Sequence, residues 1–126
     1  MTDSVLIGPT DAEKVVLDFL HNSTTFSDWG SGTKTPIDST PDHFIMVRQV
    51  DGDATNTLLY RHSIRLRVWD KSEGVATRAA SALIAHLRRG LMARLVSLPV
   101  ALPDSVDTSK VFYQFVVQIP TIGETQ

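Results

Sequence analysis

The segment from Leu58 to Trp69, LLYRHSIRLRVW, alternates apolar and polar residues with a period of two. Successive side chains of a β-strand point to opposite faces of a sheet, so this period predicts a strand. One face carries Tyr60, His62, Ile64, Leu66 and Val68, and the other carries Arg61, Ser63, Arg65, Arg67 and Trp69. We expect the first face to be core and the second to meet water, as in an antiparallel sheet covered by helices on one side.

Three further strands are expected around this one. HFIMVRQV, His43 to Val50, predicts a hairpin partner, joined to it by a loop over Asp51 to Thr57. LMARLVSLPVAL, which follows Gly90, contains a third strand whose limits are not defined by any pattern. VFYQFVVQIP predicts the last strand, and its outer face is unusually apolar for a wet surface: Phe112, Gln114, Val116 and Gln118.

Two amphipathic helices are predicted, over Asp11–His21 and Lys71–Arg89. Thr10 with Glu13, and Asp70 with Glu73, have the spacing of capping boxes, so Thr10 and Asp70 are the expected N-caps. Gly90 is expected just beyond the C-terminus of the second helix.

The element order α-β-β-α-β-β predicts one α+β domain over residues 1–126. We expect two layers: a mainly antiparallel four-stranded sheet and two helices on one of its faces. Residues 22–42 are expected to form a long loop and residues 120–126 a flexible tail. Phe26 and Trp29, the two aromatics of the loop, either pack on the edge of their own core or dock onto a neighbouring subunit.

Composition removes several classes of function. The chain has no cysteine, which excludes disulfides, thiolate catalysis and cysteine-rich zinc sites. A net charge of −2 argues against a general nucleic-acid binder. The first residues do not resemble a signal peptide, and no apolar run approaches the ~20 residues that cross a bilayer, so a soluble intracellular protein is expected.

No pattern of catalytic or ligand-binding residues stands out. P-loop, GxGxxG and HExxH motifs are absent, and none of the four histidines has another three or four residues away. His62 is expected to be a hydrogen-bonded residue of the sheet rather than a metal ligand. Asp51 and Asp53 flank Gly52 in a turn, where aspartate is common for conformational reasons. We therefore expect no enzyme and no catalytic, cofactor-binding or metal-binding residue.

The remaining signal is the face of the strand that carries arginine. Arginine and tryptophan are enriched at binding hot spots, and arginine pairs with carboxylates in a forked geometry. A plain solvated face is the simpler alternative. The candidate residues for a subunit or partner interface are Arg61, Arg65, Arg67, Trp69, Phe26, Trp29, Phe112, Gln114 and Val116.

Two stretches resemble the tail terminator proteins of long-tailed phages, particularly those of actinobacteriophages. They are MVRQVDGDATNTLLYRHSIRLRVWDKSEGVATRAASALIAHL and LPDSVDTSKVFYQFVVQIP. The shared features are a capped first helix, a hairpin, a strand that ends in VW before an alanine-rich helix, and an LPD turn before an aromatic last strand. Here DGD stands where the family usually has a double glycine, and the loop 22–42 carries no family motif.

The resemblance implies a structural virion protein of the tail and neck, present in the host cytoplasm during assembly. Such proteins form a homohexameric ring at the head-proximal end of the tail tube, stop tube polymerisation and join the tail to the head. The implied partners are further copies of the chain, the major tail tube protein and the connector or stopper proteins of the head. No cofactor, no membrane and no sequence-specific nucleic-acid binding are implied, although DNA passes through such a ring. The alternatives are another neck protein (a head–tail stopper or head-completion protein), a tail-tube-like protein or, more distantly, a small α+β ligand-binding module.

Overall fold

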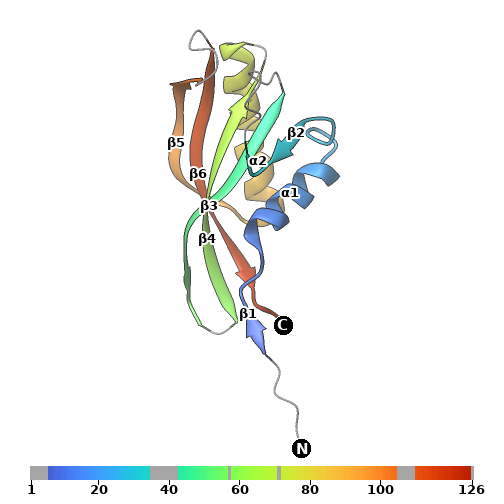
Figure 1. Cartoon of the computed structure of the whole chain (residues 1–126), viewed down its shortest axis with the longest axis vertical. Coiled ribbons are helices and arrows are strands. Elements are labelled where there is room, and N and C mark those ends of the chain that lie inside the picture. Colours follow the sequence, from blue (N-terminus) through green and yellow to red (C-terminus); the bar gives the residue numbers. More distant parts are fainter. Residues whose placement is uncertain (1–5, 35–42, 57, 71, 105–109, 126) are drawn as a thin grey trace, which may run out of the picture.

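The computed structural model of the chain describes residues 6–34, 43–56, 58–70, 72–104 and 110–125 (Figure 1). Along the chain the elements are β1 (Ile7–Gly8), α1 (Ala12–Asn22), β2 (Gly30–Gly32), β3 (Phe44–Ala54), β4 (Leu59–Trp69), α2 (Glu73–Leu91), β5 (Arg94–Pro103), β6 (Val111–Ile122) and β7 (Glu124–Thr125). The expected α+β class with two helices is confirmed.

The main sheet has five strands in the order β2-β3-β4-β6-β5. Its longer strands pair antiparallel, but β2 pairs parallel with β3, so the expectation of four antiparallel strands was wrong in this detail. The extra strand comes from the predicted loop 22–42, which folds back after α1 so that the Gly30 amide donates to the His43 carbonyl at 3.0 Å. A Cβ at Gly30 would lie 3.0 Å from the Phe44 ring, so a residue without a side chain suits this close approach. Residues 35–42 of that loop lie outside the described part of the chain.

Both helices pack on one face of the sheet, α1 mainly over β3 and α2 over β6, β4 and β5 (Figure 1). The core lies between the layers, and β4 contributes Ile64, Leu66 and Val68, which are wholly buried. The period of two in β4 therefore determines the layer arrangement, because one set of its side chains is enclosed and the other is left on the open face.

The helix caps differ from the predicted ones. The N-cap of α1 is Asp11, whose side chain accepts a hydrogen bond from the Lys14 amide, and Thr10 instead donates to the Ile122 carbonyl at 2.9 Å. The N-cap of α2 is Ser72, because the carboxylate of Asp70 is buried next to His43. In both cases a tertiary partner takes the side chain that the local pattern assigned to the cap.

The two ends of the described chain form strands that the sequence did not predict. β6 continues to Ile122, and β7 pairs with β1 in a separate two-stranded sheet. Residues 120–125, expected as a flexible tail, thus carry strand structure at both ends of the segment, and their mobility stays a prediction. Within the described residues, neither helix combines the length and the hydropathy that crossing a bilayer would need.

Gly90 has a different role from the expected one. α2 continues through it to Leu91, and the left-handed residue after the helix is Met92, with φ of 55°. A Cβ at Gly90 would overlap the ring of Phe19 on α1, with Cζ only 2.7 Å away. Glycine at this position therefore lets the two helices approach each other.

We predict that Gly90→Ala lowers the free energy of unfolding by about 1–3 kcal/mol, the usual cost of overpacking. The matched control is Gly74→Ala in the first turn of α2, where an added methyl group would contact nothing. This second substitution should be neutral or stabilising by up to about 1 kcal/mol, because alanine favours the helix. Urea unfolding of both variants measures the difference, and equal stability would show that the Phe19 ring moves aside freely.

Candidate functional site

The face of the main sheet opposite the helices carries the predicted arginines. Arg61, Arg65 and Arg67 occupy alternate positions of β4, and the strand register places Arg65 between Arg48 on β3 and Val116 on β6. Arg48 is also paired with α1, since its Nε lies 4.0 Å from Glu13 Oε2. Within the described part of the chain, no ion pair joins the three β4 arginines to a carboxylate.

Arg67 is held by its neighbours on the sheet. Its Nε donates to Gln114 Oε1 at 2.9 Å, and its guanidinium lies over the Phe112 ring, 4.9 Å from the centroid. Burial lowers the pKa of Arg67, and the like charge of Arg65 lowers it further. Arg67 is therefore partly a structural residue, and its positive charge is fixed in position.

Arg65 is less well satisfied. Its Nε is buried and has no hydrogen-bond partner among the described residues. A buried donor left without an acceptor costs about 1–3 kcal/mol, and a movement of the Arg65 side chain toward an acceptor on another molecule would remove this cost. Arg65 is the point on this face where the isolated chain most lacks a partner.

Trp69 and Phe112, two of the predicted interface residues, belong to the fold itself. They form a second, small apolar cluster with Met46 on the open side of the sheet. Trp69 is only 2% exposed, and its Nε1 donates to Asp104 Oδ1 at 3.0 Å. Both residues lie on the open side of the sheet, as expected, but the ends of three neighbouring strands bring their side chains together and cover them. Their role in an interface stays a prediction. Gln114 and Val116, farther along β6, are half-buried.

The loop aromatics follow the first of the two alternatives. Phe26 is 2% exposed and is part of the main core, so docking of this residue onto a neighbouring subunit is not supported. Trp29 is half-buried and meets Phe26 edge to face at 5.5 Å. It also borders a shallow hollow of about 490 Å³, which is lined by residues of the loop and of α2 and by Asp70.

Sequence reasoning missed an exposed apolar surface on β5. Val96, Leu98 and Val100 on β5 are exposed, Leu98 by 72%. They lie on the edge strand of the sheet, and two register shifts interrupt its pairing with β6. Those irregularities removed the period of two that would have identified the strand, although the run of large apolar residues between Leu95 and Leu102 was a visible signal.

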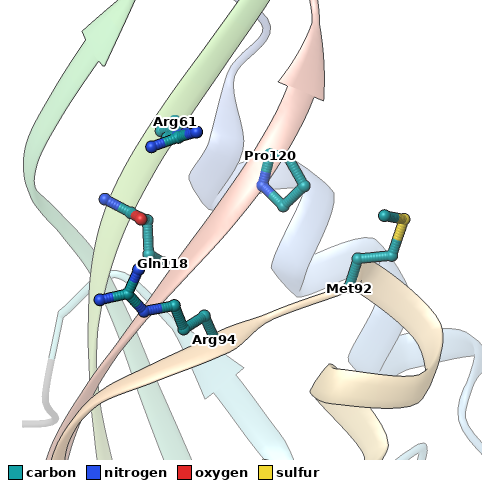
Figure 2. A pocket seen from close by; sticks show the side chains of 5 residues that line it. All are labelled: Arg61, Met92, Arg94, Gln118 and Pro120. Atoms are coloured by element: carbon teal, nitrogen blue, oxygen red, sulfur yellow. The ribbon is translucent and has the colours of Figure 1, made fainter.

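A small hollow joins this edge to the arginine face. It measures about 250 Å³ and is lined by Arg61, Met92, Arg94, Gln118 and Pro120. Figure 2 shows the side chains of Arg61, Gln118 and Arg94 one below another on the same side of the sheet. Two guanidinium groups beside a carboxamide can accept an anionic group such as a carboxylate.

His62 lies on the inner face, as expected, within a hydrogen-bonded group. Its Nδ1 is 3.2 Å from Gln49 Oε1 and its Nε2 is 2.7 Å from Thr121 Oγ1. Burial lowers the pKa of His62. Among the described residues, no cluster of three or more histidine, aspartate or glutamate side chains could hold a metal ion.

No protein-family model matches this chain, and no curated protein is significantly similar to it.

We predict that Arg67→Ala destabilises the isolated chain by about 1–2 kcal/mol, since it removes a charged hydrogen bond and a cation–π contact. Arg61→Ala is the matched control, because Arg61 is exposed on the same strand and the same face. Its cost should stay within about 0.5 kcal/mol. Urea unfolding measures the loss of unfolding free energy in both variants, provided that the m-value is unchanged. An equal loss in the two variants would mean that Arg67 is no more than a solvated charge.

We also predict that His62 makes stability depend on pH. Its folded pKa lies below the ordinary value of 6.5, so the unfolded chain binds the proton more readily. The stabilisation is complete above pH 6.5 and is lost as the pH falls below it. The measurement is the unfolding free energy at a series of pH values from about 7.5 down to about 5, the range in which histidine titrates. As the pH falls, this free energy should decrease more steeply in the unsubstituted chain than in His62→Gln. Parallel curves for the two proteins would contradict this.

Proposed function

We propose that this protein is a tail terminator of a long-tailed phage: a structural protein that forms a ring on the head-proximal end of the tail tube, stops its growth and presents the surface to which the head joins. The observation that carries the proposal is the open sheet face, where Arg61, Arg65 and Arg67 form no ion pair with a carboxylate among the described residues and where β5, two strands away, adds an exposed apolar edge. The resemblance of the two sequence stretches to tail terminators supplies the identity of the assembly.

The chemistry of this face suits a contact with protein. Arginine forks bind carboxylates, and the neighbouring glutamines and valines provide amide and apolar contacts of the kind found at interfaces. The surface is polar enough for the subunit to stay soluble before it assembles, since permanent interfaces are usually more hydrophobic. A protein that waits as a free subunit and then caps a finished tube needs both properties.

Immunogold electron microscopy of particles and of purified assembly intermediates tests the proposal. A terminator should be labelled only at one end of tails, including tails that have not joined a head, and loss of its gene should give overlong tails. Label on tailless heads would identify a head–tail stopper or head-completion protein instead. Label along the whole tube would identify a tube protein, and absence from the particle would overturn the proposal.

Arg65→Glu separates assembly from folding. The new carboxylate would lie next to Arg67 along the strand and Arg48 across it, where two like charges now face each other. The isolated variant should therefore be at least as stable as the unsubstituted chain, because a repulsive cross-strand pair becomes an attractive one. In a complementation assay it should nevertheless fail to limit tail length. Normal tails would mean that Arg65 makes no contact in the assembly.

The hollow beside Trp29 is the observation that favours the second candidate, a small ligand-binding module. It is lined mainly by apolar side chains, with Asp70 and Arg78 at its border. It is shallow, whereas ligand pockets typically bury 70–90% of a ligand. Thermal shift in the presence of a fragment library would reveal binding there, and Trp29→Ala would remove it.

A further inference from the structure

The main sheet has two edges that are open, and they differ in charge. One is β5. The other is the far half of β3, from Arg48 to Ala54, because β2 covers only Phe44 to Met46. Two donors of this edge are held by side chains rather than by a strand: the Gln49 amide donates to Glu13 Oε2 on α1 at 2.7 Å, and the Gly52 amide donates to Asp51 Oδ1 at 2.7 Å. A neighbouring strand would replace the Glu13 side chain at Gln49. In Figure 1 the β3–β4 hairpin extends beyond β2 and the helices. An unpaired edge presents free backbone donors and acceptors on which another strand can form.

The register connects the two edges at one level. Asp51 pairs with Ser63, Ser63 with Gln118, and Gln118 with Arg94. These four residues form one row across the sheet and share its open face, with a carboxylate at one end and a guanidinium at the other. Asp51 and Arg94 are both exposed, and neither takes part in an ion pair within the described residues.

The strand directions allow the two edges to meet. β3, β4, β6 and β5 are successive antiparallel neighbours, so β5 runs opposite to β3. If copies are related by rotation about an axis parallel to the strands, the β5 of one copy meets the β3 of the next in antiparallel orientation and at the same level. This contact joins two different surfaces, which is the condition for a ring rather than a closed pair.

We propose that a second copy of this chain docks edge to edge, with Arg94–Ser97 at the start of β5 of one copy pairing with Arg48–Asp51 of the next, so that Arg94 of the first faces Asp51 of the second. The proposal rests on the ring of the proposed function and names the surfaces that would build it. Asp53, two residues farther along the same edge, would lie toward the hollow that Arg61 and Arg94 border. The partner of the β5 edge is thus a strand that carries carboxylates, and β3 of a second copy is such a strand.

The irregular features of β5 fit this pairing. Counting antiparallel from Arg94 and Asp51 places Ser97 opposite Arg48 and Pro99 opposite Met46, where β2 already covers β3. The paired stretch therefore ends before the proline, which has no amide to donate. Within the paired stretch β3 has one register shift, between Gln49 and Asp51, and β5 has one, between Leu95 and Ser97. The two strands therefore contribute the same number of residues to the contact. The exposed Val50 and Val96 at these shifts would be diagonal neighbours across the contact.

A cysteine pair tests the contact directly, because the chain has no cysteine of its own. Within one copy, positions 51 and 94 are separated by three strand spacings, about 14 Å, whereas a disulfide needs Cα atoms within about 7 Å. The double variant Asp51→Cys with Arg94→Cys should therefore give a ladder of cross-linked copies on a non-reducing gel, ending at the size of the ring. The control, Asp51→Cys with Arg78→Cys on α2, should remain monomeric. No ladder, either at the highest soluble concentration or in purified tails, would overturn the proposal.

Charge reversal tests the identity of the partner. Arg94→Asp alone and Asp51→Arg alone each place like charges opposite each other and should weaken self-association roughly tenfold or more. A mixture of the two variants should associate again, since every contact in an alternating ring then joins opposite charges. If Arg94→Asp weakens assembly but Asp51→Arg does not, Arg94 faces another acidic protein or a DNA backbone and the proposal fails.

These outcomes are separable from the proposed function. A ladder in a protein that never labels tail ends would leave the edge contact standing and remove the terminator role. Tails that are capped normally by both charge variants would leave the terminator role standing and remove the edge contact.

Discussion

The inner face of β4 is the constraint on which the rest of the structure depends. This strand pairs on both sides, with β3 and with β6, and its inner side chains lie beneath the two helices. Ile64, Leu66 and Val68 are wholly buried, and each contributes about 1.5–3 kcal/mol of transfer free energy. Because neighbouring residues of a strand point to opposite faces, burying these three commits Arg65 and Arg67 to the open side. The position of the candidate site thus follows from the position of the core.

The parts of the fold that sequence could predict are those with a local cause. The period of two in β4 and the helical spacing in α1 and α2 each arise from one element meeting one core, so they are visible in a single segment. β2 could not be predicted, because Gly-Ser-Gly has no strand preference and pairs only since the chain folds back against β3. The caps were misassigned for the same reason: Thr10 and Asp70 are bound by Ile122 and His43, which are remote in sequence.

The candidate site shows the same division. The shared direction of Arg61, Arg65 and Arg67 follows from alternation alone. The burial of Trp69 does not, because it requires knowing that Met46 and Phe112 end beside it on neighbouring strands. The row from Asp51 to Arg94 is likewise invisible without the register of three strand pairs, although both residues stand plainly in the sequence. What the isolated chain leaves unsatisfied, from Arg65 Nε to the open edges of the sheet, becomes apparent only in three dimensions.

The central claim is that the open edges of the sheet are completed by further copies of the chain, and amide hydrogen exchange measures this most directly. The outward-pointing amides of residues 94–97 and 48–51, apart from Gln49, whose amide already donates to Glu13, should exchange rapidly in the isolated subunit and slowly in the assembled ring. The amides of β4, which is paired on both sides in either state, provide the internal reference. The same slow exchange in subunit and assembly, or the same rapid exchange in both, would contradict it.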